Sequence, residues 1–217
     1  MKSIALVILI SLSSILAIAQ KNVTDVTLLF DITVESTADS KPQVANMFNG
    51  ATQTVYIKGA NHRTEDVNSL GTSTTLYNGN TKTAVVLKEY GATKLLITMT
   101  AQNWADVNKK FATVTYTKDA ETKKIANYNC VKYIGKMPDG SSFTIFATKD
   151  IVPETTDYKN DLYKNVDGLV LQYEYSISGM KVTNTVASVN LRPIAANKFE
   201  VPKSGYREMT YEESKLK

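Results

Sequence analysis

The sequence contains few of the side chains on which most catalytic and metal sites depend. Among its 217 residues are one cysteine, one histidine and one tryptophan. Exported domains that rely on disulfides carry a larger, even number of cysteines, so this fold must be stabilised by burial of apolar side chains. The single thiol, Cys130, alternates with the apolar Ile134, and we expect a small buried hydrophobe there. A reactive thiolate would need basic or helix-terminal neighbours that the sequence does not single out.

Candidate catalytic residues are equally scarce. The lone histidine, His62, lies in GANHRTED, where we expect a solvated strand residue more than a base or a metal ligand. No G-x-S-x-G elbow or phosphate-binding glycine loop occurs, and acidic pairs such as Glu65/Asp66 and Glu212/Glu213 resemble ordinary surface charge. We therefore predict no enzymatic activity, no metal and no cofactor. A hydrolase that uses two carboxylates stays as a minor hypothesis.

The charge pattern does not favour nucleic acid as a partner. The formal net charge is +4 at pH 7, and the basic residues are scattered and offset by nearby acids, as in KEYGATK and EESKLK. Proteins that bind nucleic acid instead gather lysine and arginine into a patch or stripe. We expect no nucleic-acid partner.

The first twenty residues predict export. Lys2 supplies a positive region, residues 4–16 an apolar region, and Ala17-Ile18-Ala19 a cleavage site before Gln20, which is the pattern of a secretory signal peptide. The apolar run is short and interrupted by serines, which argues against a membrane anchor. No cysteine lies beside the cut, so we expect no lipid-anchored start. The prediction is a mature, soluble chain in the periplasm or outside the cell, without a transmembrane segment.

The remainder, residues 20–217, is predicted to form a single β-rich domain. Hydrophobic and charged contents of 43% and 21% are ordinary for globular proteins, and no repeat or linker divides the chain. Alternating apolar residues from Val26 to Val34, and short β-rich runs separated by Asn78-Gly79-Asn80 and Gly91-Ala92, indicate antiparallel hairpins. The expected fold is mainly β with some α. It is a curved antiparallel sheet of roughly eight to ten strands, an open half-barrel with one to three short helices packed on or in its concave face.

Helical signals are confined to three short segments. NWADVNKKF offers Asn103 as an N-cap, with apolar residues following at helical spacing. PETTDYKNDLY (153–163) can place two apolar residues on one helical face. TYEE (210–213) has capping-box spacing, and we expect the tail to fray from about residue 214.

A hairpin is predicted around Asp139-Gly140, within YNCVKYIGKMPDGSSFTIFAT. A two-residue turn would place Ile134 opposite Ile145 and Tyr133 opposite Phe146. These pairs lie on opposite faces, so both faces of the hairpin would carry apolar residues. Strands that are apolar on both faces belong in the interior of a layered structure.

An apolar ribbon lies late in the chain, in YKNVDGLVLQYEYSISGMKV (163–182). A turn at Ser178-Gly179 would bring Tyr175 opposite Val182 and Leu171 opposite Val186, with a polar interruption where Tyr173 meets Asn184. The alternating apolar residues of this ribbon form a strip along one of its faces. Two interpretations stay open, because the strip can line a groove or belong to the ordinary core beneath the helices. The candidate ligand-binding residues are Leu169, Leu171, Tyr173, Tyr175, Val182 and Val186.

Four segments, taken in order, resemble an exported bacterial family. They are ETKKIANYNCVKY (121–133), DGSSFTIFATKDIVP (139–153), YKNVDGLVLQYEY (163–175) and FEVPKSGYREMTYEE (199–213). They are similar to the uncharacterised families named for the GLPGLI motif, which are common in Bacteroidota. Asn127 stands where glycine is usual, and Val166-Asp167-Gly168-Leu169 departs from the naming motif. The resemblance implies a half-barrel like that of the LolA/LppX-like periplasmic lipoprotein carriers, in which a curved sheet wraps an apolar groove.

Two main hypotheses of function follow. The first is an exported, non-enzymatic carrier or sensor that holds a lipid, acyl chain or other apolar ligand in a groove of the curved sheet. The alternative is a structural or protein–protein interaction module of the cell envelope with a fully packed interior. An elongated cavity of at least ~300 Å³ lined by the strip would favour the carrier, whereas an interior filled by side chains would favour the interaction module.

Overall fold

The computed structural model describes residues 20–36, 48, 50–156, 162–177 and 179–216. The predicted signal peptide, residues 1–19, lies outside these ranges, and so do the middle of PETTDYKNDLY and Ser178 of the predicted turn. Among the described residues, no helix has the length and apolar character that a membrane span requires.

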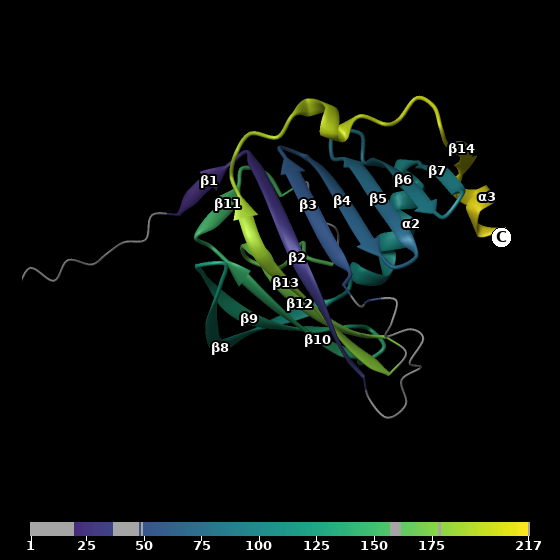
Figure 1. Cartoon of the computed structure of the whole chain (residues 1–217). Coiled ribbons are helices and arrows are strands. Elements are labelled where there is room, and N and C mark those ends of the chain that lie inside the picture. The colour runs from purple at the N-terminus through teal and green to yellow at the C-terminus, as the bar shows by residue number, and fades with distance from the viewer. Residues whose placement is uncertain (1–19, 37–47, 49, 157–161, 178, 217) are drawn as a thin grey trace, which may run out of the picture.

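Twelve strands form one large curved sheet that does not close into a barrel, as Figure 1 shows. Adjacent strands are antiparallel except for one parallel pair at an edge, so the predicted half-barrel-like β fold is confirmed with two strands more than expected. A separate parallel pair joins β1 (Lys21–Val23) to β11 (Ile151–Pro153). In order across the large sheet, the strands are β14 (Arg207–Thr210), β7 (Thr93–Met99), β6 (Thr83–Tyr90), β5 (Gly71–Asn78), β4 (Asn61–Asn68), β3 (Thr52–Lys58), β2 (Asp25–Ser36), β13 (Met180–Asn190), β12 (Leu169–Ile177), β10 (Ser142–Thr148), β9 (Tyr128–Lys136) and β8 (Thr115–Ile125).

Short helices are capped by side chains at two of the predicted places. In α2 (Ala101–Asn108) the N-cap is Thr100, whose Oγ1 accepts the Asn103 N–H at 3.1 Å. The predicted N-cap was therefore wrong, because Asn103 is the third helical residue and its Oδ1 accepts the Thr100 N–H. The capping box at Thr210 is confirmed, and α3 (Tyr211–Lys215) continues past the point where fraying was expected. Two 3₁₀ turns, η1 (Lys109–Phe111) and η2 (Ala196–Phe199), are also present.

The hairpin of β9 and β10 forms at the predicted place with a different register. The connection has five residues, 137–141, because the chain leaves the sheet at Lys136 and Met137 N–H donates to the Ser141 carbonyl at 2.8 Å. Tyr133 therefore lies opposite Ile145, and Ile134 is 39% exposed. The predicted pairing was wrong by one residue. Both faces nevertheless hold buried apolar side chains, since Ile145 and Phe146 are both buried.

Three apolar clusters stabilise the sheet. The largest includes Leu28 and Phe30 of β2 and the fully buried Leu171 of β12. A second joins Tyr133 and Ile145 to Val166 in the segment before β12, and a third holds Leu76, Leu87 and Leu96. Cys130 is 0% exposed, as predicted, and burial raises the pKa of its thiol to about 11. The thiolate is therefore disfavoured at neutral pH.

The C-terminal segment, residues 191–206, crosses the sheet from β13 to the far edge (yellow in Figure 1). Asp25 accepts the Ile194 N–H at 2.6 Å and the Lys58 ammonium at 2.8 Å. Arg63 donates to the Lys198 carbonyl at 3.0 Å, and the Tyr206 hydroxyl donates to Glu89 at 2.5 Å. Since Arg63 alternates with His62 and Thr64 along β4, this segment covers the face of β4 opposite to those two residues.

Candidate functional site

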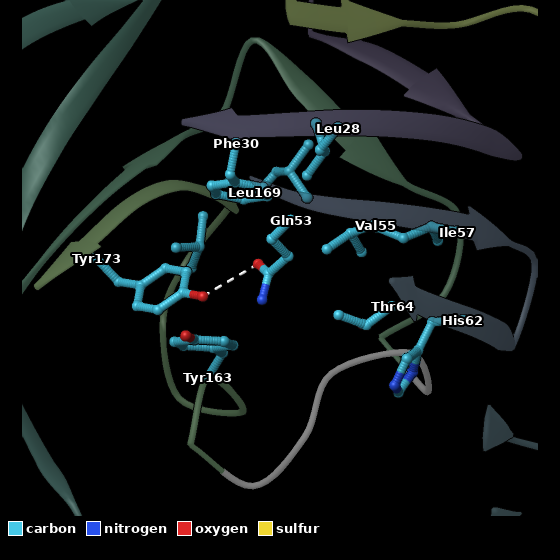
Figure 2. A pocket seen from close by; sticks show the side chains of 11 residues that line it. Leu28, Phe30, Gln53, Val55, Ile57, His62, Thr64, Tyr163, Leu169 and Tyr173 are labelled. Carbon is cyan, nitrogen blue, oxygen red and sulfur yellow. Dashed lines mark hydrogen bonds between the residues drawn. The ribbon is translucent and has the colours of Figure 1, made fainter. Parts of the chain in front are cut away.

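A cavity of about 200 Å³ lies between β2, β3 and β4 on one side and β12 with the segment before it on the other; we call it the pocket. Its apolar wall consists of Leu28, Val55, Ile57, Leu169 and Val170. Register explains this wall, because Leu28 pairs with Val55 and Val55 with Thr64, so alternate residues of three strands share one face. Figure 2 shows Leu28, Val55, Ile57 and Leu169 directed into one space.

Aromatic rings form one end of the pocket. The Tyr173 ring lies 5.9 Å from Phe30 in an edge contact and 5.9 Å from Tyr163 at 55° (Figure 2). The Tyr175 ring, which is 36% exposed, stacks on Tyr173 at 6.2 Å. Burial raises the pKa of both Tyr163 and Tyr173, so their hydroxyls stay neutral at physiological pH.

The segment before β12 positions Tyr163 over this end. Tyr116 donates a hydrogen bond to the Leu162 carbonyl, and Tyr133 donates to the Asp167 carbonyl at 3.3 Å. The Val166 N–H closes a turn onto the Tyr163 carbonyl at 3.0 Å. These contacts fix the segment on the second apolar cluster and place its tyrosine against β12.

A hydrogen-bonded chain leads from the aromatic end to a carboxylate. The Tyr173 hydroxyl donates to Gln53 Oε1 at 3.0 Å, and Gln53 Nε2 donates to Asp66 Oδ1 at 2.8 Å. Burial raises the pKa of Asp66, and the Gln53 hydrogen bond opposes that rise. Burial is the main reason that the pKa values of Tyr173 and Tyr175 are raised. The negative charge of Asp66 raises both pKa values further. The carboxylate therefore acts electrostatically on this end of the pocket.

His62 forms the opposite end of the pocket. Its ring stacks on Tyr77 at 4.9 Å, and Tyr77 lies 5.0 Å from Trp104 of α2. The expectation of a solvated histidine was wrong, because His62 is 9% exposed. Its position in β4 faces the pocket, and α2 packs over the neighbouring strands on that same face.

The structure separates the six strip residues that the sequence suggested. Leu169 and Tyr173 line the pocket, whereas Leu171, Val182 and Val186 are buried in the sheet and do not appear in its described lining. The Tyr175–Val182 pairing is confirmed. A bulge interrupts the strip, because Phe146 pairs with Gln172 and Ala147 with Val170, which leaves Leu171 unpaired with β10. Ligand binding by any of the six stays a prediction.

Sequence reasoning missed the lining residues of β2, β3 and β4. Their alternation was recognised for β2 and indicates a buried face. The missing information was strand order, because β2 pairs with the distant β13 as well as with β3. The clearest signal available was Gln53, a polar residue on the face where Val55 and Ile57 are apolar.

A larger hollow of about 370 Å³ lies elsewhere, between β11 and the segment before β12. Its lining includes Lys149, Lys164 and Asp167, and the Lys149–Asp167 ion pair is more than half exposed on both sides. No group of histidine, cysteine and acidic residues that could hold a metal ion occurs in the described part of the chain. The pocket, with its mainly apolar lining, is therefore the better candidate site.

Comparison with known proteins identifies no family for this chain. No family model matches the chain, and no curated protein matches it. PNGF-II is similar at 13% identity with a TM-score of 0.49, over 88% of this chain and 32% of PNGF-II, so the chain spans about a third of that protein. An uncharacterized conserved protein from Thermus thermophilus has 10% identity and a TM-score of 0.49, over 86% and 90% of the two chains. A putative outer membrane lipoprotein-sorting protein domain from Vibrio parahaemolyticus has 5% identity and a TM-score of 0.17, over 81% and 87%. The relationship to the GLPGLI-motif families stays a prediction.

Proposed function

We propose that this protein is a non-enzymatic binding protein that holds a small apolar group, about one ring in size, in the pocket. The observation that carries the proposal is the cavity of about 200 Å³ with an apolar wall and a few polar groups at its ends. An engineered cavity of roughly 150 Å³ lined by leucine, isoleucine and phenylalanine binds benzene. One ring with a small substituent therefore fits the described lining.

The volume of the pocket favours a smaller ligand than the lipid or acyl chain that the sequence suggested. A cavity of at least ~300 Å³ would suit a carrier of a long acyl chain, and the pocket is smaller. Leu171, Val182 and Val186, which would have extended a groove, are packed against neighbouring side chains. The open cavity still favours a small ligand over a module whose interior is completely filled.

The chemistry of the described lining supports binding more than catalysis. The tyrosine hydroxyls are neutral, because burial raises their pKa, and Tyr173 already donates to Gln53. His62 is stacked in a row of aromatic rings. Such groups fix the orientation of a ligand without supplying a paired nucleophile and base.

A matched pair of variants tests the binding site. Val55→Phe adds a ring to the pocket wall, whereas Leu29→Phe adds one to the opposite, exposed face of β2. Saturation-transfer NMR with toluene and with a bulkier probe, pyrene, should show toluene binding to the wild type and to Leu29→Phe. Binding should be lost in Val55→Phe, and pyrene should not bind at the pocket. Toluene binding that survives Val55→Phe in a folded variant would refute the proposed site.

We also propose that the protein is exported after cleavage following Ala19. The charged start, apolar run and small-x-small site of residues 1–19 support this proposal. Mass spectrometry of natively expressed protein should find a mature N-terminus at Gln20. An intact Met1, or a lipid on the mature N-terminus, would contradict it.

A further inference from the structure

We propose that the ligand carries a positive charge, as an amine or a quaternary ammonium, and that this charge lies at the aromatic end of the pocket beside Tyr163 and Tyr173. The inference rests on the proposed function and adds the chemical class of the ligand to it. It is carried by three features: the arrangement of the rings, the position of Asp66, and the absence of lysine and arginine from the described lining.

The rings at this end pack around Tyr173. Tyr173 has Phe30 at one side and Tyr163 at the other, each with ring centroids 5.9 Å away and neither parallel to it. Figure 2 shows Tyr163 and Tyr173 at the same end of the cavity, away from Val55 and Ile57. Groups of tilted aromatic rings are the arrangement that proteins use to hold alkylammonium groups through cation–π attraction. A desolvated cation gains most from such contacts.

Asp66 supplies a negative charge that no described cation balances. Its neighbour Glu65, on the opposite face of β4, forms ion pairs with Arg63 at 2.6 Å and Lys198 at 3.3 Å. Asp66 is partly buried, and within the described residues its side chain bonds to the neutral amide of Gln53 and forms no ion pair. Buried carboxylates are normally paired. A cation on the ligand beside Tyr173 would place a compensating positive charge two hydrogen bonds away from this carboxylate.

The same charges disfavour an anionic ligand. The described lining of the pocket contains no lysine or arginine, and His62 lies at the end opposite to the tyrosines. Asp66 is linked to Tyr173 through Gln53 by hydrogen bonds of 2.8 Å and 3.0 Å, which places its negative charge close to the aromatic end. A carboxylate or phosphate placed there would be repelled by Asp66 and would lose its hydration without a partner. A neutral ligand would leave Asp66 unpaired.

Three probes of one ring separate the alternatives: phenyltrimethylammonium, its uncharged isostere tert-butylbenzene, and benzoate. NMR titration of the full mature chain should show phenyltrimethylammonium binding at least about tenfold more tightly than tert-butylbenzene, with benzoate weakest. Asp66→Asn keeps an acceptor for Gln53 Nε2 and should bring the ratio of the first two probes close to one. The control Asp31→Asn removes an exposed carboxylate of β2 and should leave the ratio unchanged.

Each other outcome has a defined meaning. If tert-butylbenzene binds as tightly as the ammonium probe, or benzoate binds best, the cationic ligand is refuted while the proposed pocket function stands. If none of the three probes binds the wild type but toluene does, the cationic ligand is refuted while the proposed function stands; if toluene also fails to bind, both proposals fail. Should Asp66→Asn not fold, Tyr163→Leu removes one ring at unchanged charge. That variant should weaken phenyltrimethylammonium more than tert-butylbenzene, and equal weakening would refute the cation–π contact.

Discussion

Truncation of Leu171 to alanine should destabilise the protein strongly without acting directly on the pocket. Leu171 is 0% exposed, belongs to the largest apolar cluster and lies at the bulge of β12, outside the described lining of the pocket. The three carbon atoms removed account for about 2.4 kcal/mol, at roughly 0.8 kcal/mol each. The cavity left behind raises the loss of unfolding free energy to about 3–4 kcal/mol, within the range measured for buried leucines.

Urea unfolding followed by circular dichroism measures this loss directly. Leu171→Ala should shift the midpoint to lower urea at an unchanged slope, and the melting temperature should fall by about 10 °C. Tyr175→Ala, on the same strand but 36% exposed, should lose much less. The toluene affinity of folded Leu171→Ala should stay close to that of the wild type. A loss below about 1 kcal/mol, together with lost toluene binding, would show that Leu171 lines the site and that the packing described above is wrong.

Three further substitutions test particular backbone and charge features. Ala126 and Asn127 form the β8–β9 turn with φ of 47° and 71°. Ala126→Asn should raise the unfolding free energy by about 0.5–1 kcal/mol, because asparagine tolerates the left-handed backbone region better than alanine. A lower thermal midpoint would contradict this prediction. Gly71 has φ of +143°, and an added Cβ would lie 2.0 Å from the Glu89 carbonyl oxygen. Gly71→Ala should therefore lower the free energy of unfolding by about 2 kcal/mol or more in chemical denaturation. A loss within experimental error would refute the clash. Burial raises the pKa of Asp66 in the folded state, so the folded protein holds this proton more tightly and the contribution of Asp66 to stability falls as pH rises through its folded pKa. The stability of Asp66→Asn relative to the wild type should accordingly increase from about pH 3 to neutral pH, and a constant or opposite difference between their urea midpoints would show that the carboxylate is not penalised by burial.

Local patterns in the sequence were sufficient to predict most of the strands, though not β8 or β14, and most of the turns. Asn78-Gly79 and Gly91-Ala92 do separate hairpin strands, and Thr210 does cap a helix, because these signals depend on backbone preferences within a few residues. The β9–β10 register was missed because Asp139-Gly140 suggested a two-residue turn, whereas hydrogen bonds from Met137 and Gly140 close a longer one. Hairpin turns of different length differ little in free energy, so the packing of Tyr133 and Ile145 selects the register.

The pocket could be predicted in part. Alternation in β12 correctly led to Leu169 and Tyr173. It also suggested Leu171, because a bulge opposite Phe146 and Ala147 cannot be seen in a run of alternating residues. The contribution of Gln53 and Thr64 depends on which strands become neighbours across the sheet. That order depends on the pairing of β2 with the distant β13, which is a long-range contact that local alternation does not encode.

The order of strands divides the large sheet into two consecutive meanders. Strands β2 to β7 follow one another in space as in sequence, and β8, β9, β10, β12 and β13 do the same. The pairing of β2 with β13 joins the two meanders, so this seam closes a long loop and should form after the local hairpins. The pocket lies across that seam, with Phe30 and Gln53 on one meander and Tyr163 and Tyr173 on the other. A bound ligand would therefore hold the two halves of the sheet together, and hydrogen exchange of the β2–β13 amides should slow in proportion to pocket occupancy.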